Sequence, residues 1–475
     1  MARFTRTSAI LLLCVVINFL FIVLFLYLDA VPGVPYSLLK KTLQNAKSAY
    51  QGSTLDSDPD LESATAIVIP AECEDPYRMP GYLVLPENVT DPATLKETVY
   101  VPFYDTFTDR PPVAIATYPQ PPHQNFDFAP TKTPDAELMR QAPTDWMVRI
   151  QKHVYNQNNP LVYFDENDED AIADVAARNR TARELVWLRN KRVLMLADSV
   201  DRYMLMHFCT QAGVQGIEGL IGKHTLAICH IPSLNFTITH WHIPGMLSAT
   251  PDWWYISEIS HVPFEARFED MYKQYLNLTI GMDGKGPDLI IYQSILWDTF
   301  NFARGPAAHA LTGLSSTNEP PDEGRLLFWS ELEFYRSRQQ IMINYFRSLF
   351  SNSAPFLYRS ALNHRFEGPI DIPVYQLDRV ARAVAHANSI EVLEWAQFAR
   401  GFYEIYRDVI HVNLSAQSWL YSNMMLYYLF RATGGEEVRG RVTKWPLTDV
   451  DKQVRHWSKG DTWEKCNQYN RVLYR

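Results

Sequence analysis

The chain has 475 residues, of which 47% are hydrophobic and 20% are charged, and its formal net charge is −9. This composition is sufficient for a large packed core, arranged as one large domain or two ordinary ones. Because the chain is acidic overall and no basic stripe stands out, we expect that it does not bind nucleic acid.

An almost continuous apolar run occupies residues 9–28. Twenty helical residues rise about 30 Å, which matches the hydrocarbon core of a bilayer. A cleaved signal peptide is the alternative, but its apolar region is usually only about 7–15 residues long. We therefore expect a cytosolic tail at 1–8, a transmembrane signal anchor at 9–28 and a polar stem at 29–66.

Cysteines and glycosylation sequons indicate on which side of the membrane the body lies. Four cysteines follow the apolar run, an even number that suits disulfides outside the cytosol. Of the three possible pairings, chain separation favours Cys209–Cys229 with Cys73–Cys466. Five sequons also follow the run. We expect a single-pass type II membrane protein with residues 67–475 in the Golgi or ER lumen, glycosylated at Asn88, Asn179, Asn235 and Asn277.

The body changes character along the chain. Prolines interrupt short apolar runs between 67 and about 135, which indicates irregular or β-edged structure, and 136–190 is more helical with an acidic loop at 165–170. Short buried strands are then expected at 192–197, 288–294, 354–360 and 389–396, and helical patterns within 324–350 and 376–388. Such alternation predicts an α/β fold with a parallel sheet covered on both faces.

Ligands of such sheets bind beyond the carboxyl ends of the strands, where Ser199, Gln293 and Arg359 would all lie. Ser199 stands between a strand and a helix, where it could be a nucleophile stabilised by the helix N-terminus. On this stretch alone, the simpler interpretation is that Ser199 caps the helix. Asp408 and His411, three residues apart, could supply an oriented base. Gln293 or Ser294 could stabilise an oxyanion, or only satisfy backbone groups at the strand end.

Four stretches in order carry a family resemblance: "LRNKRVLMLADSVDRYMLMHFC", "PDLIIYQSILWD", "FLYRSALNHRFEG" and "DVIHVN". Together they resemble the SGNH (GDSL-like) superfamily, and within it the PC-esterase branch. That branch contains trichome-birefringence-like polysaccharide O-acetyltransferases and the lumenal domains of sialate O-acetyltransferases. The resemblance covers roughly residues 185–430.

The resemblance implies a three-layer SGNH-like fold and an enzyme that moves an acyl group, with acetyl favoured. Its partners would be an acyl donor and a glycan or polysaccharide acceptor, without a cofactor or metal. Ser199 would be the nucleophile, His411 the base and Asp408 the residue that orients it. The expected oxyanion or substrate residues are Gln293, Ser294, Arg202, Arg359, His364 and Trp297.

Two departures from the family pattern bear on activity. Ala197 stands where the family has glycine, and Gln293 stands where it has asparagine, one methylene shorter. A displaced donor of about 1 Å can cost on the order of 10²-fold in rate. A non-catalytic, glycan-binding member is therefore one alternative. The family's glycine donor could be Gly216, Gly219 or Gly245.

A type II glycosyltransferase is the other alternative, with "DSD" (56–58) or "DED" (168–170) as a metal motif, although both are better explained as solvated loops. Alternation places His240 and His242 on one face of a strand, where sugar contact or plain packing explains them better than a metal pair. We expect Asn413 to be unglycosylated, because a glycan there would crowd His411, and to cap the helix that follows.

Overall fold

The computed structural model describes residues 75–78, 81–102, 139, 142–160, 168–222, 224–246, 263–280, 286–304, 324–350, 355–388 and 390–433. The expected anchor at 9–28, the stem at 29–66, the "DSD" motif, Cys73 and Cys466 all lie outside these ranges. The chain divides into residues 1–68 and 69–475, and every described residue belongs to the second unit. Within the described ranges, no helix has both the length and the apolarity needed to cross a bilayer.

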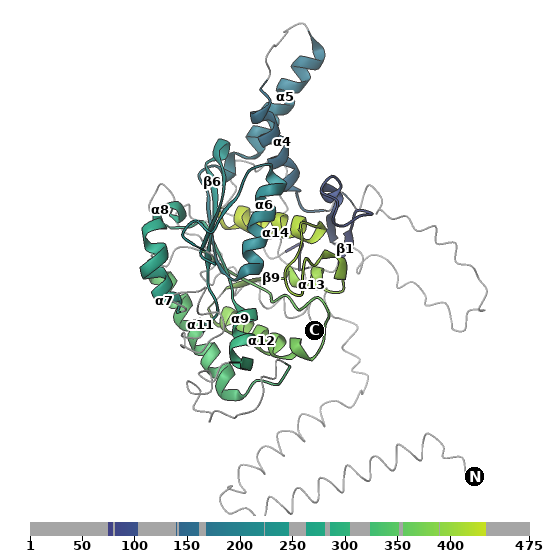
Figure 1. Cartoon of the computed structure of the whole chain (residues 1–475). Helices are drawn as coiled ribbons and strands as arrows, with labels where there is room; N and C mark the ends of the chain where they lie inside the picture. The colour runs from purple at the N-terminus through teal and green to yellow at the C-terminus, as the bar shows by residue number, and fades with distance from the viewer. Residues whose placement is uncertain are drawn as a thin grey trace, which may run out of the picture. The chain divides into compact units, whose positions relative to one another are not determined.

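A seven-stranded sheet forms the centre of this unit (Figure 1). Its strand order is β4-β5-β6-β3-β7-β8-β9. Its strands are β3 (Arg192–Ala197), β4 (Ile217–Glu218), β5 (Leu226–Ile231), β6 (Phe236–His242), β7 (Leu289–Gln293), β8 (Phe356–Arg359) and β9 (Glu391–Leu393). The four expected strands are thus confirmed as β3, β7, β8 and β9. They run parallel, with β6 added beside β3, whereas β4 and β5 are antiparallel at one edge.

The order of the parallel strands explains why β3 is central to the site. Taken in chain order, the five parallel strands are arranged 2-1-3-4-5, so the chain leaves β3 toward β6 on one side and later returns to β7 on the other. A crevice at the carboxyl end of such a strand is the usual ligand position in open α/β sheets. Every residue of β3 and β7 is buried, as expected for strands covered on both faces.

Helices cover both faces of the sheet and make a three-layer α/β arrangement (Figure 1). One group consists of α4 (Trp146–Asn158), α6 (Ser199–Ala212) and α14 (Ala416–Thr433), which pack on one another. The opposite group consists of α7 (Phe264–Arg267), α8 (Leu276–Thr279), α9 (Ile295–Arg304), α11 (Trp329–Leu349) and α12 (Ile372–Ala387). The helices expected within 324–350 and 376–388 are therefore confirmed as α11 and α12, the latter beginning four residues earlier than its pattern indicated.

The remaining elements are shorter or peripheral. Helix α5 (Glu169–Glu184) packs on α4, and α13 (Ala396–Ala399) follows β9; β1 (Gly81–Val84) and β2 (Val99–Pro102) form a separate antiparallel pair. The acidic stretch 168–170 begins α5, where the Asp168 side chain accepts hydrogen bonds from the backbone N–H groups of Asp170 and Ala171. These acids therefore cap and begin a helix, which is sufficient to explain them without a metal.

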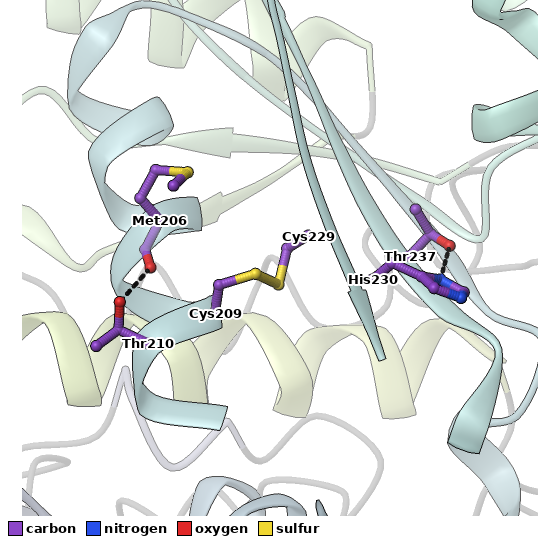
Figure 2. The surroundings of a disulfide bond; sticks show 6 residues. All are labelled: Met206, Cys209, Thr210, Cys229, His230 and Thr237. Atoms are coloured by element: carbon purple, nitrogen blue, oxygen red, sulfur yellow. Dashed lines mark hydrogen bonds between the residues drawn. A yellow bond between two sulfur atoms is a disulfide. The ribbon is translucent and has the colours of Figure 1, made fainter. Parts of the chain in front are cut away.

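A disulfide joins Cys209 in α6 to Cys229 in β5 (Figure 2). Both cysteines are buried. This pairing confirms one of the two expected disulfides. It ties the helix that begins at Ser199 to the antiparallel edge of the sheet.

Candidate active site

Asp198, and not Ser199, caps helix α6. Its side chain accepts a hydrogen bond of 2.9 Å from the backbone N–H of Val200, and Ser199 is the first helical residue. The interpretation of Ser199 as the cap is therefore wrong, because the preceding carboxylate already serves the free N–H groups. The Ser199 hydroxyl is left for a different partner.

That partner is His411, which lies 212 residues later in the chain. Ser199 Oγ is 2.7 Å from His411 Nε2, and His411 Nδ1 is 2.8 Å from Asp408 Oδ2. Since a carboxylate can only accept, the imidazole carries its proton on Nδ1, and Nε2 accepts from the serine hydroxyl. The structure thus brings together the three residues that the sequence analysis selected.

Local hydrogen bonds orient the Asp408 side chain. Its Oδ1 accepts from the backbone N–H groups of Ile410 and His411, each at 2.9 Å. Burial alone would raise the pKa of Asp408, but these bonds and the imidazole outweigh it and lower that pKa below its usual range. Asp408 therefore stays ionised.

The surroundings of His411 favour its neutral form. Burial lowers the pKa of His411 below its ordinary value, and Asp408 opposes this effect only in part. The positive charges of Arg202 and Arg407 act in the same direction as burial. A neutral imidazole at ordinary pH is what a general base requires.

Helix α6 also holds the loop that carries His411. His207 Nε2 donates to the carbonyl of Val412 at 2.9 Å, and the ring of Tyr203 lies 4.7 Å from that of His411. Sequence reasoning missed Tyr203 and His207. The available signal was their spacing from Ser199, because positions four and eight residues later fall on the same face of a helix.

Gln293 is the last residue of β7 and Ser294 follows it, beside the serine turn. Gln293 is paired in register with Ala197 of β3, and its Oε1 accepts from Arg359 Nη2 at 3.0 Å. Ser294 Oγ instead donates to Asp298 Oδ2 at 2.9 Å. The serine hydroxyl is thus engaged within the protein, whereas the Gln293 side chain still has its amide nitrogen to offer.

Arg359 has a different environment from the one expected of a substrate-binding residue. It is fully buried, and its Nε and Nη2 donate to the Asp201 carboxylate at 2.7–2.9 Å. Arg202 is less enclosed, with its guanidinium 3.8 Å from Glu218 and over the Tyr203 ring. Of these two arginines, Arg202 is therefore the one whose contact with Glu218 a ligand could replace.

His364 and Trp297 are also buried. His364 Nδ1 is 2.8 Å from Asp371 Oδ1, and Trp297 packs edge-on against the ring of His242. Their burial leaves little ring surface for stacking on a sugar.

Of the three candidate glycines, Gly245 lies three residues after β6, whose last residue, His242, pairs in register with Ala197. Its φ is +97°, and an added Cβ would lie 2.6 Å from Asp298 Oδ1. Gly216 and Gly219 instead flank β4 at the outer edge of the sheet. The placement favours Gly245 as the close-approach glycine of this site.

The β6 histidines share one face, as alternation predicted, with their rings 5.9 Å apart. His240 Nε2 donates to the carbonyl of Asp198 at 2.9 Å, so this histidine supports the turn before Ser199. Burial lowers the pKa of His240 to about 4, which keeps it neutral. In the described part of the chain, no group of three His, Cys, Asp or Glu side chains could hold a metal ion.

The sequon asparagines differ in accessibility. Asn88, Asn179 and Asn277 are exposed, whereas Asn235 is half-buried and its Nδ2 donates to Asn190 Oδ1. Glycosylation at these sites stays a prediction. Asn413 lies three residues before the first residue of α14, so the expectation that it caps this helix is wrong. Its backbone N–H bonds to the carbonyl of Ile405 instead.

Fold and site together define an α/β protein with a serine, histidine and aspartate in line at the carboxyl edge of a parallel sheet. No protein-family model and no curated protein matches the chain. Among solved structures, a protein described as a GDSL-like lipase from Parabacteroides merdae aligns at 13% identity with a TM-score of 0.28, covering 50% of this chain and 96% of that one. Likeness at this level carries no argument about activity.

Proposed function

We propose that the chain is a serine-dependent acyl-transfer enzyme of SGNH type. The observation that carries this proposal is the alignment of Ser199 Oγ, the His411 ring and the Asp408 carboxylate, with contacts of 2.7 and 2.8 Å. A nucleophile, a base within hydrogen-bond reach and a third group that orients the base are the parts that acyl transfer through a covalent intermediate needs.

In the first step, Ser199 Oγ attacks the carbonyl carbon of an acyl ester while His411 Nε2 takes the serine proton. The tetrahedral intermediate collapses, its bond to the leaving oxygen breaks, and His411 returns the proton to that oxygen. In the second step, His411 takes a proton from an acceptor hydroxyl, which attacks the acyl carbon. The bond between that carbon and Ser199 Oγ breaks, and His411 returns the proton to Oγ. A sugar hydroxyl as acceptor gives a transferase, and water gives an esterase.

The acyl group and acceptor are the finer part of the proposal. We favour acetyl transfer onto a glycan by a lumenal, membrane-anchored enzyme. The four-block sequence resemblance supports this, together with the apolar run at 9–28 and the sequons that follow it. Arg202, partly exposed beside His411, is the residue best placed to contact such a substrate.

The test is the intact mass of residues 67–475 after brief incubation with p-nitrophenyl acetate. We expect one added acetyl group that maps to Ser199 and is absent in Ser199→Ala. Ser348→Ala, which removes an exposed hydroxyl on α11, should acylate like the unmodified protein.

Each other outcome has a definite meaning. The proposal would be overturned if the unmodified protein and Ser199→Ala were both acetylated at another residue, or if neither were acetylated although both are folded. Sugar binding without acylation would identify a non-catalytic glycan-binding protein. Activity that survives Ser199→Ala but is lost with a chelator would point to a glycosyltransferase. Once an acyl-enzyme is found, free sugars that discharge it faster than water would identify a transferase.

A further inference from the structure

A buried network connects the serine helix to the end of β7. Arg359, the last residue of β8, contacts Asp201 through Nε and Nη2 at 2.7–2.9 Å. Tyr421 in α14 donates to Asp201 Oδ1 at 2.8 Å, and Arg359 Nη2 also donates to Gln293 Oε1 at 3.0 Å. Arg359 and Asp201 have no exposed surface, and Gln293 is 1% exposed.

The guanidinium is held in place from several directions. Its contacts with Asp201 are charge-assisted and involve two of its nitrogens, and Nη1 donates to the carbonyl of Ser360 at 2.9 Å. Because Asp201 stands two residues after Ser199 in α6, the position of Arg359 is set relative to the serine itself.

Arg359 determines which way the Gln293 amide points. A guanidinium donates and never accepts, so the atom that faces it must be the amide oxygen. The amide nitrogen then faces away from Arg359. In the described part of the chain, Gln293 Nε2 is buried and has no hydrogen-bond partner, although buried amide donors are nearly always paired in folded proteins.

The position of this unused donor suggests what it pairs with. Gln293 is the register partner of Ala197, two residues before Ser199, at the edge of the sheet where the acyl carbonyl would be attacked. An oxygen that gains negative charge in the tetrahedral intermediate is the acceptor that a pre-oriented donor stabilises most.

We infer that Arg359 is a positioning residue, which presents the Gln293 amide nitrogen to the oxyanion and is itself held by Asp201. The inference rests on the proposed function. It assigns Arg359 a role that acts through Gln293 and requires no contact with substrate. It also explains how glutamine, one methylene longer than the asparagine of the family pattern, can serve at position 293. Arg359, paired with Asp201, holds the Gln293 amide in a defined orientation.

The test is a double-mutant cycle on the rate of acylation by p-nitrophenyl acetate. Gln293→Met removes the amide at similar size and should lower the rate by about 10²-fold or more, with KM little changed. Arg359→Lys keeps a positive charge opposite Asp201 but loses the planar fork, and it should lower the rate by about 10-fold or more. In the Gln293→Met background, Arg359→Lys should have almost no further effect on the rate.

Arg325→Lys is the matched control, because Arg325 makes a two-nitrogen contact with Glu331 that is no part of the proposed site. It should change thermal stability without changing the acylation rate. Equal effects of Arg359→Lys in both backgrounds would overturn the inference, as would full activity of Gln293→Met. Either result leaves the proposed function intact as long as Ser199 is acylated in the unmodified protein, whereas absence of that acylation defeats the proposed function itself.

Discussion

Two neighbouring residues have separate tasks at the start of α6. Asp198 accepts from the backbone N–H of Val200, and Ser199 directs its hydroxyl to His411. Burial raises the pKa of Asp198 to about 7, against the effect of the nearby Arg359 guanidinium. Because Asp198 accepts from the N–H group at the start of the helix, the Ser199 hydroxyl is not needed as a cap and can contact His411.

The pH dependence of acylation should report the protonation of His411. Its pKa is lowered by burial, so protonation, and loss of the base, occurs only below the ordinary value of 6.5. We therefore expect the rate of acylation by p-nitrophenyl acetate to fall as the pH drops through an apparent pKa below 6.5. The rate would be measured by stopped flow from about pH 4 to about pH 9.

The variant Asp408→Asn tests whether Asp408 orients His411 and raises its pKa. Removing the carboxylate should slow acylation by about 10²–10⁴-fold, because the imidazole loses its orientation and its charge partner. Asp408 raises the pKa of His411, so the remaining activity should have its acid limb at lower pH than the unmodified protein. An acid limb that moves to higher pH would contradict the assignment of Asp408.

At the level of elements, α6 organises most of the site. Its first residue is Ser199, its side chains at 203 and 207 contact the His411 loop, and Asp201 holds Arg359. Cys209 bonds it to β5 on the sheet (Figure 2). Helix α6 is thus held at its start by hydrogen bonds and near its end by a covalent link.

Loss of the Cys209–Cys229 disulfide should destabilise the domain. The bond closes a loop with a sequence separation of 20, for which chain entropy predicts a contribution of about 3 kcal/mol to the free energy of unfolding. Cys209→Ala combined with Cys229→Ala should lower the urea midpoint accordingly. The unmodified protein with its disulfide reduced should show the same decrease. If neither of these proteins has a lower urea midpoint than the oxidised protein, the bond adds no stability.

At the level of the whole described structure, its first and last described segments are in contact. Asp75 accepts from the hydroxyl of Tyr428 at 2.8 Å and lies 3.7 Å from both Arg78 and Arg431. Arg431 in α14 also lies 3.4 Å from Glu391 in β9. These side chains are buried, so the segment before β1 completes the cover over β9 and α14.

Neutralising Asp75 should therefore cost stability far from the proposed site. Asp75→Asn removes a buried carboxylate that lies 3.7 Å from two buried guanidiniums, and breaking a buried pair in this way costs about 3 kcal/mol or more. Glu97→Gln, an exposed acid of the same region, should change the free energy of unfolding by less than about 0.5 kcal/mol. Denaturation in urea measures both, and equal effects would refute the role of the buried cluster.

Features that depend on neighbouring residues could be predicted from the amino-acid sequence alone. Short apolar runs identified β3, β7, β8 and β9, and periodic patterns identified α11 and α12, because burial of one strand or one helix face leaves a local signature. The same reasoning placed Ser199 and Gln293 at the carboxyl edge of the sheet. The spacing of Asp408 and His411 also anticipated their direct contact, since it needs only one turn of chain.

Contacts between distant segments could not be predicted in this way and follow from the three-dimensional fold. It set the 2.7 Å contact of Ser199 with His411, 212 residues apart, and it paired Arg359 with Asp201 across 158 residues. It also gave the capping role to Asp198 and added β4 and β5 as an antiparallel edge. Such contacts depend on which strands become neighbours and on how side chains share the buried space between them, and no local pattern records either.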